Sequence, residues 1–273
     1  MALSLRRWLP ISIIILIAAT LRLSLLFTRG DFWFDEVFSV HFSALPWRDF
    51  LHFAVLETNP PLFTAFLRIF QGVTETTSEW LIRLPSLVFG LFTIILVYHV
   101  GKKMFSTTAG LIGALFLSLS GIHIFVSTEA RVYSLLGLLT IASLLFFYTI
   151  CIEERETRIR WICFAGVNLL LLFSHLSALA LIATEFFTLL LVQSPKKIIK
   201  PWIITHAIIG ALWLTWCIPS LASKMNAGSG SAWFFQDAYA REANLLTLPL
   251  TLFASGRMPP FVSTCVIILI MLS

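Results

Sequence analysis

Long apolar runs, each close to the thickness of a lipid bilayer, recur along this chain. Four of them occupy residues 11–27, 84–100, 111–126 and 132–152. A helix of about 20 apolar residues spans the hydrocarbon core of a bilayer. The composition agrees, because 58% of the residues are hydrophobic and 12% are charged, against about 45–50% and about 25% in soluble proteins. The sequence therefore predicts an all-α, polytopic transmembrane helix bundle.

Basic residues in short loops indicate which side of the membrane each loop occupies, because Lys and Arg are retained on the cytoplasmic side. With the N-terminus inside, ten of the 19 basic residues fall in four short cytoplasmic segments. The cytoplasmic loops thus account for the net charge of +5. Nucleic-acid binding is therefore not predicted. About eight spans are expected, near residues 9–27, 80–101, 108–127, 132–152, 161–177, 178–193, 201–219 and from 260 onward.

Residues 28–79 are expected to form one long outer loop, although the loop holds two apolar segments. Segments 47–56 and 61–70 are shorter than the roughly 17 residues that a spanning helix needs. Charged residues interrupt both segments, a pattern that suits helices lying in the membrane interface. Pro60 and Pro61 end the first of them.

Three regions follow from this reading. Residues 1–219 form the transmembrane module that carries the candidate chemistry. Residues 220–259 form a second outer loop, and residues 260–273 begin a further span. The last apolar run is too short to cross a bilayer of about 30 Å, so we expect the chain to be a piece of a longer protein.

An acidic pair, Asp35 and Glu36, follows an aromatic run where the first span reaches the outer surface. Carboxylates held against apolar rings lose part of their hydration, which raises their basicity, as a general base requires. In a helix the two side chains point about 100° apart, so only one would face a given substrate atom. The alternative is a helix start, where acidic residues stabilise the helix dipole.

Glu129 and Arg131 lie between the expected third and fourth spans, at the outer surface. An arginine there can bind a lipid phosphate, because its planar donors match phosphate oxygens; the alternative is snorkelling of its charge to the interface. His175, at the outer end of the fifth span, either contacts such a phosphate or is packed and hydrogen-bonded. Arg22, near the end of the first span, is expected to snorkel outward.

Four motifs, in this order along the chain, resemble those of the GT-C glycosyltransferases. They are the Asp35–Glu36 pair, Asn-Pro-Pro-Leu at 59–62, Arg-Leu-Pro at 83–85 and Glu-Ala-Arg-x-Tyr at 129–133. The chain looks most similar to the branch that contains protein O-mannosyltransferases and bacterial aminoarabinose lipid A transferases. The resemblance covers about residues 1–220, the shared N-terminal module of the family.

The resemblance implies an inverting transfer of a hexose or pentose from a polyprenyl-phosphate sugar. The acceptor would be a hydroxyl of a lipid, glycan or protein on the non-cytoplasmic face of a bacterial cell (inner) membrane. Asp35 matches the acidic base of the family, and Glu36 matches its neighbour, which positions acceptor or base. Arg131 matches the ligand of the donor phosphate, with Glu129 beside it. Asn59 stands where many members have Lys or His, so the second phosphate contact lacks its cation here. Some members use a divalent metal, but the sequence shows no ligand set for one.

Two other functions share some of these features. A transporter also carries buried polar residues such as Glu185, but its helices are usually broken at mid-membrane and arranged in paired repeats. A non-catalytic membrane partner would fit a short chain. Because the charges gather in one outer loop, the sequence favours the glycosyltransferase.

Overall fold

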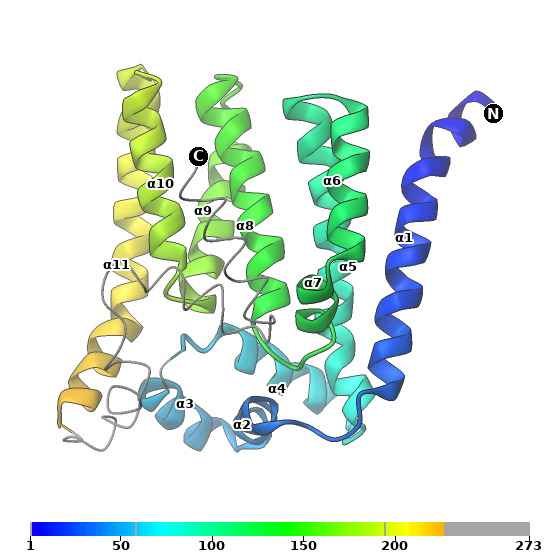
Figure 1. Ribbon diagram of the computed structural model, residues 1–273. Coiled ribbons are helices and arrows are strands. Elements are labelled where there is room, and N and C mark those ends of the chain that lie inside the picture. The colour runs from blue at the N-terminus through cyan, green and yellow to red at the C-terminus, as the bar shows by residue number, and fades with distance from the viewer. Residues whose placement is uncertain (1, 58, 194, 227–273) are drawn as a thin grey trace, which may run out of the picture. The chain divides into compact units, whose positions relative to one another are not determined.

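The computed structural model describes residues 2–57, 59–193 and 195–226. Every regular element within these ranges is a helix, which confirms the predicted all-α class. The predicted outer loop at 220–259 lies almost wholly, and the further span at 260–273 wholly, outside the described residues. The helices are α1 (Ala2–Thr28), α2 (Phe34–Ala44), α3 (Trp47–Leu56), α4 (Leu62–Thr74), α5 (Glu79–Met104), α6 (Thr107–Leu119), α7 (Gly121–Val126), α8 (Tyr133–Phe147), the π-helix η1 (Tyr148–Ile152), α9 (Arg158–Ser174), α10 (Ala178–Leu191) and α11 (Lys196–Asn226) (Figure 1).

The first of two compact units, Met1–Ser220, holds the elements that build the site. In this unit α1, α5, α6, α8, α9, α10 and α11 run along a common direction, while α2, α3 and α4 lie across one end of them (Figure 1). Among the described residues, four helices are long and apolar enough to cross a membrane: Trp8–Thr28, Glu79–Met104, Tyr133–Ile152 and Lys196–Ser223. The arrangement confirms a bundle of membrane helices.

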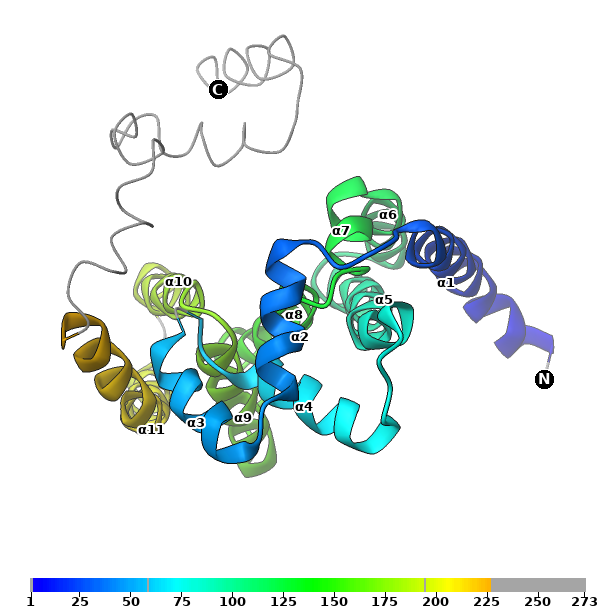
Figure 2. The ribbon, with the colours of Figure 1, turned by 90° about the horizontal axis from the view of Figure 1, so that it is seen from below.

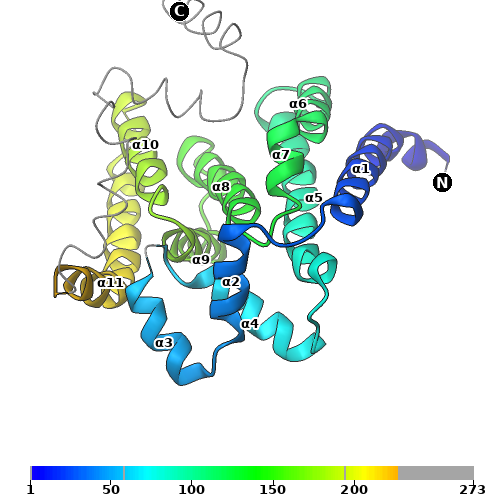
Figure 3. The same ribbon diagram turned by 60° about the horizontal axis from the view of Figure 1, so that its bottom comes forward.

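The predicted outer loop contains three helices that cover one end of the bundle (Figure 2). Helix α3 has the predicted bounds, and α4 extends the predicted segment 61–70 to its C-terminal side. Phe63 and Leu67 are four residues apart and lie on one face of α4, where they are buried in a core shared with α8, α9 and α11. The indole N–H of Trp216 in α11 donates to the carbonyl of Ala54 in α3 at 2.7 Å. Helix α2 packs against α4 (Figure 3).

The predicted third span is interrupted at Ser120, between α6 and α7. The Ser120 hydroxyl accepts a hydrogen bond at 3.3 Å from a backbone N–H in the first turn of α7. Arg22 of α1 donates to the carbonyls of Ser118 at 3.1 Å and Leu117 at 3.4 Å, at the end of α6. Helix ends leave carbonyl groups that need donors, and Arg22 supplies them. Arg22 is fully buried, so the expectation that it snorkels to the surface is wrong.

Helix α5 contacts α1, α6 and α8 and supports the segment that precedes α8. At Gly90 a Cβ atom would collide with the side chain of Ser127. Glycine therefore allows the segment 127–132 to lie directly against α5. This segment carries Glu129 and Arg131, and its close contact with α5 brings both residues to the end of the bundle that α2, α3 and α4 cover.

Candidate active site

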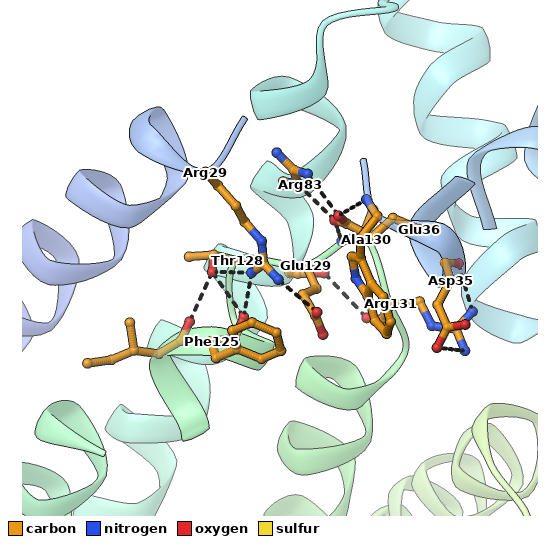
Figure 4. A network of polar contacts seen from close by, with 12 residues as sticks. Arg29, Asp35, Glu36, Arg83, Phe125, Thr128, Glu129, Ala130 and Arg131 are labelled. Atoms are coloured by element: carbon orange, nitrogen blue, oxygen red, sulfur yellow. Dashed lines mark hydrogen bonds and ion pairs between the residues drawn. The ribbon is translucent and has the colours of Figure 1, made fainter. Parts of the chain in front are cut away.

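Glu36, in the first turn of α2, forms a buried ion pair with Arg83 of α5 (Figure 4). Two donors of Arg83 bind the two carboxylate oxygens, each at 2.8 Å, so the pair is bidentate. Arg83 also donates to the carbonyls of Gly30 and Asp31, at 2.8 and 3.1 Å. The two charged side chains are exposed by 1% or less. The two charges neutralise each other. Because Arg83 also binds the carbonyls of Gly30 and Asp31, it fixes the chain between α1 and α2 against α5.

The Glu36 carboxylate also holds the segment 127–132. It accepts the backbone N–H of Ala130 at 2.8 Å and that of Trp33 at 3.3 Å. Ser127 to Ala130 are each exposed by 1% or less, and a buried N–H without an acceptor is costly. One carboxylate therefore joins α2, α5 and the segment before α8, and it fixes the position of the next residue, Arg131.

Glu129 belongs to a second ion pair in the same segment. It contacts Arg29, just after α1, at 2.8 Å. Arg29 donates as well to the hydroxyl of Thr128 at 2.8 Å and to the carbonyl of Phe125 at 3.0 Å (Figure 4). Burial raises the pKa of Glu129, and the positive charge of Arg29 opposes that rise. The ion pair of Glu129 with Arg29 thus connects the segment 127–132 to the end of α1.

Arg131 reaches α2 beside Asp35. Its guanidinium donates to the backbone carbonyl of Asp35 at 3.1 Å and to the hydroxyl of Ser39 at 3.0 Å. A guanidinium nitrogen lies 3.8 Å from the Asp35 carboxylate. The Asp35 side chain is 36% exposed and that of Arg131 14%, whereas Glu36 is fully buried. The predicted loss of hydration is therefore found at Glu36, and the two neighbouring carboxylates have different surroundings.

A small pocket of about 30 Å³ lies between α2, α4 and Arg131. Its wall includes Asn59 and Glu57 from the connection between α3 and α4, together with Ser39 of α2. The volume is about the share of one water molecule in liquid water. Only a small group fits unless α2 or α4 moves, so a sugar ring requires such a movement or must lie at the mouth of the pocket.

One donor of Arg131 is unused in this pocket. Its Nε atom is buried and has no hydrogen-bond partner among the described residues. A buried donor without an acceptor costs about 1–3 kcal/mol, and an arginine side chain matches the oxygens of a phosphate. The Cζ atom of Arg131 lies 5.8 Å from the ring centroid of Tyr133, which follows it by two positions in the chain. Arg131 thus has a buried donor without an acceptor in the part of the chain that the structure describes.

His175 lies in the connection between α9 and α10. Its ring centroid is 6.3 Å from that of Tyr133, and its Nδ1 atom is 2.9 Å from the Ser177 hydroxyl. Burial and the nearby positive charge of Arg131 lower the pKa of His175. The ring is therefore neutral near pH 7 and adds no cation to the site. It does not line the pocket.

The model of the dolichyl-phosphate-mannose-protein mannosyltransferase family matches residues 58–222, more than half of the chain. The chain belongs to this family. It is a membrane glycosyltransferase of the GT-C type, which confirms the resemblance predicted from the sequence. No curated protein matches this mannosyltransferase-family chain. The matched range contains Asn59, Arg83 and the segment 127–132, whereas Asp35 and Glu36 precede it.

The structure sorts the predicted site residues of this mannosyltransferase-family member into three groups. Arg131 and Asn59 line the pocket, and Asp35 lies beside Arg131 without lining it. Glu36 and Glu129 lie next to it in buried ion pairs. His175 adjoins Tyr133 and stays outside the pocket wall. Within the described ranges, no group of three or more His, Cys, Asp or Glu residues could hold a metal ion.

Four residues that build the site were not predicted as part of it: Arg29, Ser39, Glu57 and Arg83. Arg83 could have been found, because an arginine inside an apolar segment needs a partner. Glu57 could have been found from its position two residues before Asn59. Arg29 gives no such signal, since its partner Glu129 is 100 positions away in the chain.

Glu185 is the buried polar residue that a transporter would also carry. It is buried inside the bundle and accepts hydrogen bonds from other helices. The Ser143 hydroxyl donates to its carboxylate at 2.9 Å, and the indole N–H of Trp202 approaches at 3.4 Å. These contacts connect α8, α10 and α11. Membership of the mannosyltransferase family favours an enzyme over a transporter, and Glu185 does not line the pocket beside Arg131.

Proposed function

We propose that the chain transfers a sugar from a polyprenyl-phosphate donor to an acceptor hydroxyl on the non-cytoplasmic face, with inversion. The observation that carries this proposal is the contact of Asp35 with Arg131, whose Nε donor is unused. A carboxylate that can accept a proton thus lies 3.8 Å from a cation that can bind a phosphate. A bound phosphate competes with Asp35 for the guanidinium, which leaves the Asp35 carboxylate free to accept the proton of the acceptor.

The reaction is a single displacement at the anomeric carbon. Asp35 takes the proton of the acceptor hydroxyl while the acceptor oxygen bonds to the anomeric carbon from the face opposite the phosphate. The bond between that carbon and the phosphate oxygen breaks, and its electron pair leaves with the phosphate. Arg131 stabilises the charge that develops there, which is the kind of interaction that lowers a barrier most.

Glu36 and Glu129 act as positioning residues in this proposal. Glu36 holds α2, α5 and the N–H of Ala130 together, so it sets the distance between Asp35 and Arg131. Glu129 holds the same segment through Arg29. Asn59 offers an amide N–H to the phosphate in place of a cation, and this gives a weaker contact because a neutral amide adds no attraction between opposite charges.

The side of the membrane is inferred from the basic loops. Eight Lys and Arg residues lie in or next to the connections after α5, η1 and α10: Lys102, Lys103, Arg155, Arg158, Arg160, Lys196, Lys197 and Lys200. These connections lie at the end of the bundle opposite α2, α3 and α4 (Figure 1). Because basic loops stay in the cytoplasm, we place the site on the outer face, in the cell membrane of a bacterium.

The test measures sugar transfer by the full-length protein, with donor affinity determined separately. Polyprenyl-phosphate mannose is the first donor to try, since the family is described by that type of donor. Asp35→Asn should slow transfer by about 10²–10⁴ and leave donor affinity nearly unchanged. Glu57→Gln is the matched control, because it removes the carboxylate that lines the pocket beside Arg131, and we expect a small effect. Loss of transfer in Glu57→Gln with an active Asp35→Asn would make Glu57 the base. Full activity of both variants would contradict the proposal.

A further inference from the structure

A second cavity, of about 510 Å³, lies at the end of the bundle opposite the candidate active site. Its walls are the end of α5, the junction of α8 with η1, and the beginning of α9. None of its residues takes part in the proposed chemical step. The cavity is more than ten times larger than the pocket beside Arg131, so it has room for a ligand of appreciable size.

Positive charge dominates the polar part of this cavity. Lys102, Lys103 and Arg160 line it. Lys103 is paired with Glu153 at 2.9 Å, but in the described part of the chain Lys102 and Arg160 contact no carboxylate. The ammonium group of Lys102 lies 5.7 Å from the ring centroid of Tyr98. Two cations thus face the cavity without a counter-charge from the protein.

The remaining wall is partly apolar, with His99 and Thr149 as its polar members, and it includes a rare backbone feature. Leu145 and Phe146 supply the apolar surface. Thr149, also in the wall, belongs to the π-helix η1, and its hydroxyl is bound to the Leu145 carbonyl at 2.7 Å. Single π-helical turns inside α-helices are uncommon and often lie at functional sites. The cavity therefore joins charged and apolar surface at a place where the spanning helix departs from regular geometry.

We propose that this cavity binds the headgroup of an anionic phospholipid from the membrane leaflet on that side. The phosphate lies between Lys102 and Arg160, and the acyl chains leave along Leu145 and Phe146. A cation near a membrane surface attracts anionic lipids by about 1 kcal/mol, and the apolar wall suits a lipid better than a soluble phosphate. Lys196 and Lys200 lie on the same side of the membrane, but they are exposed and do not line this cavity.

The experiment titrates the full-length protein in detergent with phosphatidylglycerol and counts bound lipids by native mass spectrometry. Lys102→Gln with Arg160→Gln should weaken binding about thirtyfold, and Lys102→Gln alone about fivefold, on the basis of about 1 kcal/mol for each cation. The matched control is Lys196→Gln with Lys200→Gln, which removes two charges from the same side and should leave binding unchanged. Lys102→Arg with Arg160→Lys keeps both charges and should retain the lipid. Circular dichroism reports whether each variant is folded.

Three outcomes would overturn the proposal. They are no stoichiometric binding of phosphatidylglycerol, equal weakening by the cavity and control variants, and equal affinity for phosphatidylcholine. Equally tight binding of glycerol 3-phosphate, which lacks acyl chains, would show that the ligand is a soluble phosphate. Sugar transfer is measured separately on the same variants, so a failure of this proposal is distinct from a failure of the catalytic one.

Discussion

The buried pair of Glu36 and Arg83 offers the first test at the level of single residues. Glu36→Gln leaves Arg83 as a buried cation without a counter-charge, and breaking such a pair costs about 3–5 kcal/mol. We expect a lower melting temperature in detergent and a large loss of transfer. Glu154→Gln is the control, because Glu154 pairs with Lys197 at a well-exposed position, where a pair is worth about 0–1 kcal/mol.

A double variant separates stability from positioning at this pair. Glu36→Leu with Arg83→Met removes both charges together, which is often neutral for a buried pair. We expect it to recover part of the melting temperature but not transfer, because the Ala130 N–H still lacks its acceptor. If Glu36→Gln were as stable and as active as Glu154→Gln, the positioning role would be wrong.

Arg131→Lys tests the phosphate contact. The substitution keeps the charge and loses the planar fork that matches phosphate oxygens, so donor affinity and transfer rate should fall together. Arg68→Lys serves as the comparison, since Arg68 lies in α4, outside the pocket beside Arg131, with its guanidinium over the Trp47 ring at 4.5 Å. Donor titration and initial rates are the measurements. An unchanged donor affinity in Arg131→Lys would remove Arg131 from the phosphate site.

The residues that could be predicted are those whose role follows from a local motif. Asp35 and Arg131 were named from the family resemblance, and the structure places them 3.8 Å apart. The Glu36–Arg83 pair was not predicted, because its members are 47 positions apart and no local pattern connects them. The sequence can indicate that a buried arginine needs a carboxylate, but several acidic residues compete for it until the chain is folded.

At the level of secondary structure, the close contact of α5 with the segment 127–132 can be tested through Gly90. Gly90→Ala adds a Cβ that collides with Ser127, so the segment must shift away from α5 and carry Arg131 with it. We expect reduced donor affinity and transfer. Gly166→Ala in α9 is the control, because an added Cβ there has no neighbour within 4 Å. Equal activity of the two variants would show that the segment tolerates the shift.

The predicted bounds of a helix are correct where the length and pattern of an apolar segment determine them. They are wrong where a contact with a distant residue determines them. The bounds of α3 follow from a short apolar segment between prolines and charges. The break between α6 and α7 was missed, since the run 111–126 is apolar on both sides of Ser120. The carbonyls at the end of α6 accept hydrogen bonds from Arg22, which lies 95 positions before Leu117 and 96 before Ser118. Sequence windows cannot include such a contact.

The orientation of the whole molecule determines which compartment receives the sugar. All basic connections that the proposal uses lie at one end of the bundle, and α2, which carries Asp35, lies at the other (Figure 1). Placing the first end in the cytoplasm satisfies the positive-inside rule. The acceptor hydroxyl would then be outside, where the proposed lipid-linked sugar would serve as donor without a nucleotide.

Single cysteines test this orientation in intact cells. Thr77 lies between α4 and α5 and Glu156 between η1 and α9, and both are exposed. In a background whose four native cysteines are replaced by alanine, Thr77→Cys should react with a membrane-impermeant maleimide, because we place it outside. Glu156→Cys should react only after the cells are permeabilised, which also serves as the control that its thiol is accessible. The reverse pattern would put Asp35 and Arg131 in the cytoplasm and contradict transfer on the outer face.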